Sequence, residues 1–272
     1  MDERAAFWRR WDAMEARLTR PVSERMLDLG GVGAGMRVLD VAAGRGEPAI
    51  PAAHRVGPTG SVLAIDSFDG FLQIARDRAR AEGVANITWR VADAEGFNAG
   101  EASFDVATVR WALMYMRAPE RALQGIHRAL RPGGTLVTAS WADPERVLFA
   151  SLPQRVLSRY RDVPPAPEGP GVFHDADPAA FDAMLARNGF SVLASEEMAI
   201  PVVEAADGRG VLAWVTELGG SLMALVREMP PSDQRAWERD LCAAIEQTRD
   251  GATVRLTGVT RLTMARTGGA GA

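Results

Sequence analysis

Hydrophobic and polar positions follow two alternating periods along the first half of the chain. Short apolar runs, typical of buried strands, are separated by stretches in which apolar residues recur every three or four positions, as in helices. The predicted strands are 37–42, 61–66, 87–91, 104–110 and 134–141, and the predicted helices between them are 47–56, 69–82 and 118–130. This alternation predicts an α/β fold with a doubly wound parallel sheet.

The segments on either side have a different pattern. Residues 5–29 are predicted to be helical, with Pro21 dividing them into a long helix and a short one that ends at Gly30. After Trp141, helices are predicted at 146–160, 178–188, 208–228 and 232–249, and strands at 191–201 and 253–265. The last six residues, TGGAGA, are typical of a frayed terminus.

A glycine-rich turn follows the first predicted strand, within VLDVAAGRGE at residues 38–47. Gly44 and Gly46 carry no Cβ atom, so backbone N–H groups there can approach a ligand closely. Asp66 ends the second strand 20 residues after Gly46. A carboxylate at that place can accept hydrogen bonds from both hydroxyls of a ribose, although it can also serve as a helix cap or turn residue. The pattern predicts a site for a nucleoside-containing cofactor.

Other features of the turn distinguish among such cofactors. The dinucleotide pattern GxGxxG has Ala49 at its last position, where alanine is tolerated, so this motif alone is not decisive. In a GxGxG pattern the first glycine is replaced by Ala42. Glu47 opens the next helix, where its carboxylate would compete with a pyrophosphate for the helix N-terminus. Asp93 and Ala94 follow the third strand, where they can meet the edge of an adenine; the alternative for Asp93 is a turn residue. The sequence therefore favours a cofactor without phosphate.

The motifs occur in the order VLDVAAGRGE, VLAIDSFDGFLQIAR, ITWRVADAE, SFDVATVRWALMYM and ALRPGGTL. In this order they resemble the class I S-adenosylmethionine (SAM)-dependent methyltransferases, most closely the UbiE-like branch that acts on small molecules. The resemblance covers residues 36–141. It implies a Rossmann-like sheet of seven mostly parallel strands with an antiparallel last strand, SAM as cofactor and S-adenosylhomocysteine as product.

The resemblance also implies roles for individual residues. The predicted cofactor-binding residues are Asp40, Ala42, Gly44 and Gly46 at the methionine and ribose, Asp66 at the ribose, Ser67 and Phe71 near the adenine, Asp93 and Ala94 at the adenine edge, and Arg110 near the methionine. The predicted acceptor-binding residues are Trp8, Trp11, Trp111, Tyr115 and His174.

The resemblance and the predicted helices and strands together divide the chain into five parts. We expect a helical N-terminal cap over 1–35, a SAM-binding core over 36–145, inserts that form a lid and acceptor site over 146–252, the last core strand over 253–266 and a disordered tail over 267–272. The aromatic residues of the cap are expected in the lid or, alternatively, in a packed core.

Methyl transfer makes modest chemical demands, because it is an in-line displacement with a neutral leaving group. A base is needed only for a weak nucleophile, and Tyr115 and His174 are the candidates, with packing and a loop position as their alternatives. His54 and His127 lie on predicted helices and are expected to be structural. No Cys/His or Asp/Glu spacing resembles a ligand set, so no metal is expected.

The composition and net charge of the chain limit the kinds of binding partner that we expect. The chain has 272 residues, 47% hydrophobic and 24% charged, and its net charge of −4 does not favour nucleic acid. No apolar run reaches the roughly 20 residues that span a bilayer, and the single cysteine, Cys242, fits a reducing compartment. We expect a cytoplasmic monomer or homodimer with a small organic acceptor, such as a specialised metabolite or a quinone-like compound, and with neither nucleic acid nor membrane as partner.

Two other functions stay open at this point. An NAD(P)-dependent oxidoreductase is disfavoured by Glu47 and by the incomplete glycine pattern. A SAM-fold protein with a non-catalytic role or another reaction is not excluded, because no residue on the acceptor side is decisive.

Overall fold

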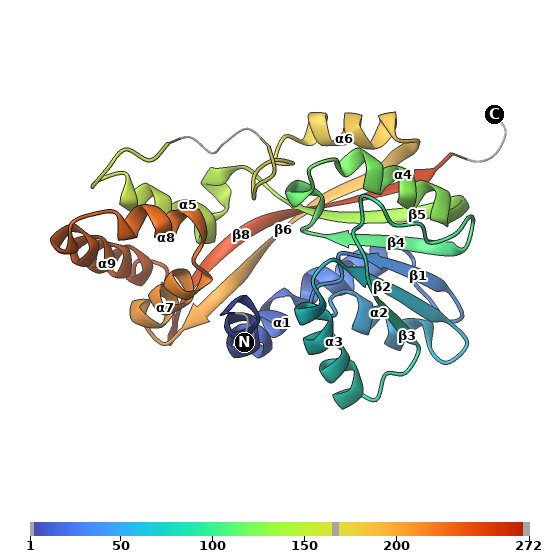
Figure 1. Cartoon of the computed structure of the whole chain (residues 1–272), viewed down its shortest axis with the longest axis horizontal. Coiled ribbons are helices and arrows are strands. Elements are labelled where there is room, and N and C mark those ends of the chain that lie inside the picture. The colour runs from blue at the N-terminus through green and yellow to red at the C-terminus, as the bar shows by residue number, and fades with distance from the viewer. Residues whose placement is uncertain (1–2, 165–168, 269–272) are drawn as a thin grey trace. The chain divides into compact units, whose positions relative to one another are not determined.

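The computed structural model of the chain describes residues 3–164 and 169–268 (Figure 1). These residues form two compact units. The larger unit comprises the described parts of Arg20–Trp141, Gly169–Met198 and Thr260–Ala272, and the smaller unit those of Met1–Thr19, Ala142–Glu168 and Ala199–Val259. One helix and two long strands, α1, β6 and β8, contribute residues to both units.

The strands form one sheet in the order β3-β2-β1-β4-β5-β8-β6, with β7 paired to β8. Their bounds are β1 Arg37–Val41, β2 Ser61–Asp66, β3 Ile87–Val91, β4 Phe104–Arg110, β5 Leu130–Trp141, β6 Phe190–Ala205, β7 Arg249–Asp250 and β8 Thr253–Thr267. The first five are parallel and β8 is antiparallel to β5. The predicted Rossmann-like α/β fold is confirmed, with the two-residue β7 as an addition.

Two apolar clusters cover the two faces of the central strands. The helices are α1 Glu3–Leu29, α2 Ala49–Val56, α3 Asp69–Ala81, α4 Pro119–Ala129, α5 Leu148–Leu157, α6 Pro178–Arg187, α7 Gly208–Leu218, α8 Gly220–Arg227 and α9 Pro231–Glu246, with short 3-10 helices η1 Leu113–Tyr115 and η2 Pro144–Arg146. One cluster joins α2 to Val38 of β1, and the other joins α4 and α6 to Leu39. Successive side chains of a strand point to opposite faces, so both faces are buried, and Figure 1 shows α4 and α6 side by side.

The smaller unit has its own core of helices. Trp214 of α7 and Trp237 of α9 are almost fully buried. The rings of Phe7 and Phe149 lie 6.4 Å from that of Trp214, and the Trp237 indole N–H donates to the Pro153 carbonyl over 3.3 Å.

Pro21 does not divide α1, which is a single helix of 27 residues, so the predicted break is wrong. A proline inside a helix removes one backbone hydrogen bond and costs about 3 kcal/mol. Val22, Met26 and Leu27 just after it have no exposed surface. Their packing keeps this part of the chain helical, because burial of an apolar face outweighs local propensity.

Glycine residues explain two further differences between the predicted elements and the structure. The predicted helix over 208–228 is two helices, because Gly219 and Gly220 adopt positive φ values of 71° and 75°. The predicted turn before 134 lies inside β5, where the pairing shifts between Phe104 with Leu130 and Val106 with Thr135. Such an irregularity accommodates the extra residues of the RPGG segment.

Smaller corrections concern the second half of the chain. The predicted helix over 146–160 starts as η2 and continues as α5 only from Leu148. Thr267, predicted in the tail, is the last residue of β8, and the Gly268 N–H donates to the Gly189 carbonyl over 3.3 Å. The rest of the predicted tail, 269–272, lies outside the described residues. Within the described ranges no single helix is long and apolar enough to cross a bilayer, although α7 and α8, bent by 98°, pass that test as a pair.

Candidate functional site

The glycine turn joins β1 to α2 through left-handed backbone at Ala42, Gly44 and Gly46, whose φ values are 57°, 54° and 99°. A Cβ on Gly46 would lie 2.6 Å from Ile50 Cδ1, whereas a Cβ on Gly44 would meet no described atom within 4 Å. Gly46 is therefore favoured both by its positive φ and by its close packing against Ile50. Gly44 faces open space, which leaves room for a ligand against its backbone.

Asp66 at the end of β2 holds this turn. Its Oδ2 accepts from the Gly44 N–H and its Oδ1 from the Phe68 N–H, both over 2.9 Å. The contact with Phe68 is the turn role that the sequence analysis gave as the alternative for Asp66. The contact with Gly44 places the carboxylate beside the open space at that glycine. A carboxylate oxygen has more than one acceptor site, so Asp66 can also accept from a ligand hydroxyl.

The predicted adenine-side residues lie at the ends of the neighbouring strands β2 and β3. Ser67 is exposed, and the half-buried ring of Phe71 packs edge-on against Phe68 at 5.0 Å. Asp93 is exposed and accepts from the Glu95 N–H over 3.0 Å, which is the turn role left open for it. Ala94 is partly buried against the core. The structure thus brings these residues to the same edge of the sheet as Asp66.

Asp40 lies beneath the turn rather than on its surface. Its side chain has no exposed surface, and Oδ1 accepts from the Thr108 hydroxyl over 2.8 Å. Burial raises the pKa of Asp40 to about 7, although the Thr108 hydrogen bond and the positive charge of Arg110 act against this rise.

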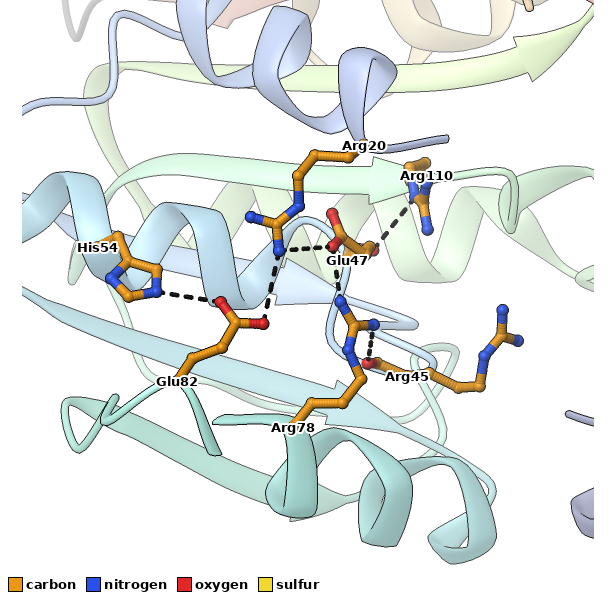
Figure 2. Close-up of polar contacts among 7 residues, drawn as sticks. All are labelled: Arg20, Arg45, Glu47, His54, Arg78, Glu82 and Arg110. Atoms are coloured by element: carbon orange, nitrogen blue, oxygen red, sulfur yellow. Dashed lines mark hydrogen bonds and ion pairs between the residues drawn. The ribbon is translucent and has the colours of Figure 1, made fainter. Parts of the chain in front are cut away.

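Three guanidinium groups contact Glu47, the residue after Gly46 (Figure 2). Its Oε1 lies 2.9 Å from Arg78 Nη2 and 3.2 Å from Arg20 Nη2, and its carbonyl accepts from Arg110 Nε over 3.2 Å. Arg78 also donates to the Arg45 carbonyl over 2.8 Å. The turn is therefore tied to α1, α3 and β4, and the buried Glu47 carboxylate is compensated by charge.

Arg110 and Trp111 follow one another at the end of β4. The Arg110 guanidinium lies 4.6 Å from the Trp111 ring, which stacks on Trp141 at 4.5 Å with an interplanar angle of 10°. The indole N–H of Trp111 donates to the Thr260 hydroxyl over 2.8 Å. These contacts hold Trp111 at a φ of 50°, which is strained for an aromatic residue. The orientation of this half-buried ring is fixed by its neighbours.

The two candidate bases belong to adjacent segments of the larger unit. Tyr115 ends η1 with 53% of its surface exposed, and partial desolvation raises the pKa of its phenol above 10, so the phenol is a donor at neutral pH. His174 is exposed on a turn whose Gly171 N–H donates to the Met114 carbonyl over 2.8 Å. The structure therefore places the turn that carries His174 against η1.

Asp175 is a candidate that the sequence analysis missed. It follows His174, only 8% of it is exposed, and its Oδ2 has no hydrogen-bond partner among the described residues. Burial raises the pKa of Asp175 to about 6, with the nearby charge of Glu120 contributing and that of His174 opposing. An aspartate after a proline- and glycine-rich loop carries no sequence signal of burial.

Trp8 and Trp11, predicted at the acceptor site, lie on α1 within the smaller unit. The Trp8 ring packs edge-on against Phe7 at 4.7 Å, and the Trp11 indole N–H donates to Glu217 Oε2 over 2.9 Å. These contacts match the packing alternative for the aromatic residues of the cap. In the part of the chain that the structure describes, no group of three potential metal ligands occurs.

Comparison with known proteins finds similar sequences for the first half of the chain. Residues 38–134 match the model of a methyltransferase domain. This region of the chain is therefore similar to methyltransferase domains. The ubiquinone/menaquinone biosynthesis C-methyltransferase UbiE of Ectopseudomonas mendocina (strain ymp) is 37% identical over 142 residues, 52% of this chain and 56% of that protein. The chain thus spans about half the length of the curated relatives it matches. The predicted resemblance is confirmed for this domain.

Solved structures agree with the fold. SpnF, a 4+2 cyclase, has a TM-score of 0.56 at 20% identity and covers 91% of this chain and 80% of its own. Phosphoethanolamine N-methyltransferase 2 of Haemonchus contortus, solved in complex with SAM, has a TM-score of 0.54 at 18% identity and covers 91% of this chain and 52% of its own. At these identities the likeness concerns the fold alone.

Asp175→Asn is expected to stabilise the folded protein at neutral pH. Because the folded-state pKa of Asp175 is about 6 and thus above the usual value of about 4, ionisation destabilises the fold progressively as pH rises through this window. The gain in the free energy of unfolding should be on the order of 2 kcal/mol larger at pH 7.5 than at pH 4.5, measured by urea denaturation. Asp177→Asn, at an exposed carboxylate nearby, is the control; equal gains in both variants would contradict the burial argument.

Proposed function

We propose that this protein transfers a methyl group from SAM to a small organic acceptor and releases S-adenosylhomocysteine. The observation that carries the proposal is the open position at Gly44, whose N–H is held by Asp66 at the carboxyl ends of β1 and β2 in a methyltransferase domain. The SAM complex of the Haemonchus contortus relative supports the cofactor. A glycine with unfilled space and a carboxylate beside it at the end of β2 fit a nucleoside ligand.

The same residues suggest how the cofactor is held. Gly44 contributes its open backbone, Asp66 accepts from the ribose hydroxyls, and Asp93 with Ala94 meets the adenine edge. Ser67 and Phe71 lie on the adenine side, while Asp40, Ala42, Gly46 and Arg110 shape the methionine side. Asp40 acts from beneath the turn because it is fully buried.

The acceptor side requires positioning more than acid–base chemistry. SAM supplies an electrophilic methyl group whose transfer leaves a neutral thioether. The fixed ring of Trp111 orients a flat acceptor, and Tyr115, protonated at neutral pH, donates a hydrogen bond to it. His174 accepts the proton of a weak nucleophile, if the acceptor has one. UbiE is a C-methyltransferase of quinone biosynthesis, which supports a quinol-like or related specialised acceptor.

A second function is favoured by one comparison. SpnF, a 4+2 cyclase, shares the fold, so another reaction on this scaffold is the alternative proposal. An oxidoreductase is less well supported, because the buried Glu47 precedes α2 where a pyrophosphate would bind. We also propose a cytoplasmic monomer or homodimer, in which the parts 1–35 and 146–252 form a cap and lid for the acceptor.

The first test of the proposal is calorimetric titration with SAM, S-adenosylhomocysteine and NAD. We expect micromolar binding of both sulfur ligands and none of NAD, whereas binding of NAD alone would contradict the proposal. Transfer of a labelled methyl group to 1,4-naphthohydroquinone and related phenols then separates a methyltransferase from a protein that only binds SAM. In that assay, Tyr115→Phe or His174→Ala should slow turnover without changing SAM affinity.

Gly44→Ala should weaken SAM binding at least tenfold, because the added methyl group fills the open position against which the ligand lies. The matched control is Gly57→Ala, since Gly57 also has a positive φ, 64°, and also has no atom within 4 Å of an added Cβ. Both variants place a side chain at a positive φ, so both are expected to lose stability to backbone strain, and SAM affinity is compared on the folded proteins. Equal SAM affinity in the two variants, measured by calorimetry, would contradict the assignment of Gly44 to the cofactor site.

Asp66→Asn should weaken SAM binding by tenfold to a hundredfold, which corresponds to about 1–3 kcal/mol for lost charge-assisted hydrogen bonds. Asp69→Asn is the control, because Asp69 lies three residues away, is exposed, and accepts from the side chains of Gln73 and Arg76. An unchanged dissociation constant for Asp66→Asn would limit this residue to its turn role.

A further inference from the structure

Asp175 is a buried acidic residue in the larger unit, and one of its carboxylate oxygens has no partner in the structure. Only 8% of the residue is exposed. Its Oδ2 makes no hydrogen bond with any residue that the structure describes. A buried carboxylate oxygen without a donor is costly, because it has lost its hydration and gained no hydrogen bond in return. A ligand that supplies the missing donor would therefore gain more here than at an exposed carboxylate.

The turn that carries Asp175 is anchored on both sides. Before Asp175, the Gly171 N–H donates to the Met114 carbonyl over 2.8 Å, which ties the turn to η1. After it, the Asp177 carboxylate accepts from the Ala179 N–H over 2.9 Å and caps α6. The backbone of Asp175 is thus fixed between η1 and α6, so its buried position follows from the fold.

The electrostatic surroundings of Asp175 favour a positively charged partner. Burial raises the pKa of Asp175 to about 6, His174 opposes this rise, and the negative charge of Glu120 adds to it. At neutral pH the carboxyl group is therefore mostly ionised. A histidine carries a positive charge only when it is protonated, so His174 compensates this buried charge incompletely.

The segment that follows β4 places Asp175 on the acceptor side of the proposed site. Glu120, whose charge acts on Asp175, belongs to the first turn of α4, and Tyr115 ends η1. A protonated amine brings three N–H donors and a full positive charge to a carboxylate, whereas a hydroxyl group brings one donor and no charge. The half-exposed phenol ring of Tyr115 adds an aromatic surface of the kind that attracts cations.

We propose that Asp175 binds a protonated amino group of the methyl acceptor, which is therefore a small organic amine. The inference rests on the proposed function, to which it adds the substrate class. It assigns Asp175 to recognition of the acceptor and not to the transfer step. A phenol that carries an aminoalkyl chain combines this amino group with the aromatic acceptor proposed above.

The test compares tyramine with tyrosol, two phenols whose side chains end in an ammonium and in a hydroxyl group. The protein is first saturated with S-adenosylhomocysteine, and the affinity for each phenol is then measured by calorimetry. The unaltered protein should prefer tyramine at least tenfold, because a hydrogen bond between two charged groups is stronger than one to a neutral donor. Asp175→Asn, which keeps the shape of the side chain without its charge, should reduce this preference to less than threefold, with little change in the affinity for tyrosol.

Asp177→Asn is the matched control, because it removes the same charge two residues away from an exposed position. Asparagine also caps helices, so this variant should keep both its fold and the full preference for tyramine. A similar loss of preference in both variants would assign the effect to the net charge of the turn and contradict the role of Asp175. If Asp175→Asn does not fold by circular dichroism, Asp175→Ala decides the question with the same two phenols.

The outcomes separate this inference from the proposed function. A full preference for tyramine in Asp175→Asn, or equal losses of affinity for both phenols, would overturn the role of Asp175 and leave SAM as the cofactor. The same conclusion would follow if the unaltered protein bound S-adenosylhomocysteine but did not bind tyramine at millimolar concentration, or did not distinguish it from tyrosol. Failure of the unaltered protein to bind S-adenosylhomocysteine would overturn both proposals.

Discussion

The hydrogen bond from the Gly44 N–H to Asp66 is the contact on which the candidate site depends. This hydrogen bond, with an N···O distance of 2.9 Å, connects the segments that follow β1 and end β2. It fixes a glycine at which an added Cβ would meet no described atom within 4 Å. The bond also stabilises the left-handed backbone conformation of Gly44, because it gives the N–H of this residue a charged acceptor. The second oxygen of Asp66 binds the Phe68 N–H, so one side chain sets both the glycine turn and the start of α3. A parallel sheet makes this possible, because its strands end at one edge.

Charge secures the turn from its other side. Glu47 brings a buried carboxylate to the turn just before α2, and the guanidinium groups of Arg20 and Arg78 compensate its charge. A buried ion pair of this kind contributes little net stability, because desolvation offsets much of the attraction. Its effect here is geometric, since it connects helices from distant parts of the sequence to a turn that must keep one conformation.

The sequence predicted the elements whose signals are local. The apolar runs at 61–66, 87–91 and 104–110 are strands with those bounds. As expected, Asp66 ends the first of them and Asp93 follows the second. The helix through Pro21 could not be predicted, because it depends on burial of Val22 and Met26 by residues far along the chain. Asp175 was missed for the same reason, as its burial arises from tertiary packing of a loop against η1.

Two buried carboxyl groups with raised pKa values, those of Asp40 and Asp175, connect the stability of the fold to its proposed chemistry. Asp40 and Asp175 have pKa values near 7 and 6 because burial disfavours their charged forms. Each therefore lowers the stability of the folded protein when it ionises, and each gains from a neighbouring positive charge. A cationic sulfonium bound near the turn would favour ionised Asp40, just as Arg110 does in the structure. Binding of the cofactor and ionisation of Asp40 would then favour one another. The ionised carboxylate of Asp40, which destabilises the free protein, would be stabilised by the positive charge of the bound cofactor.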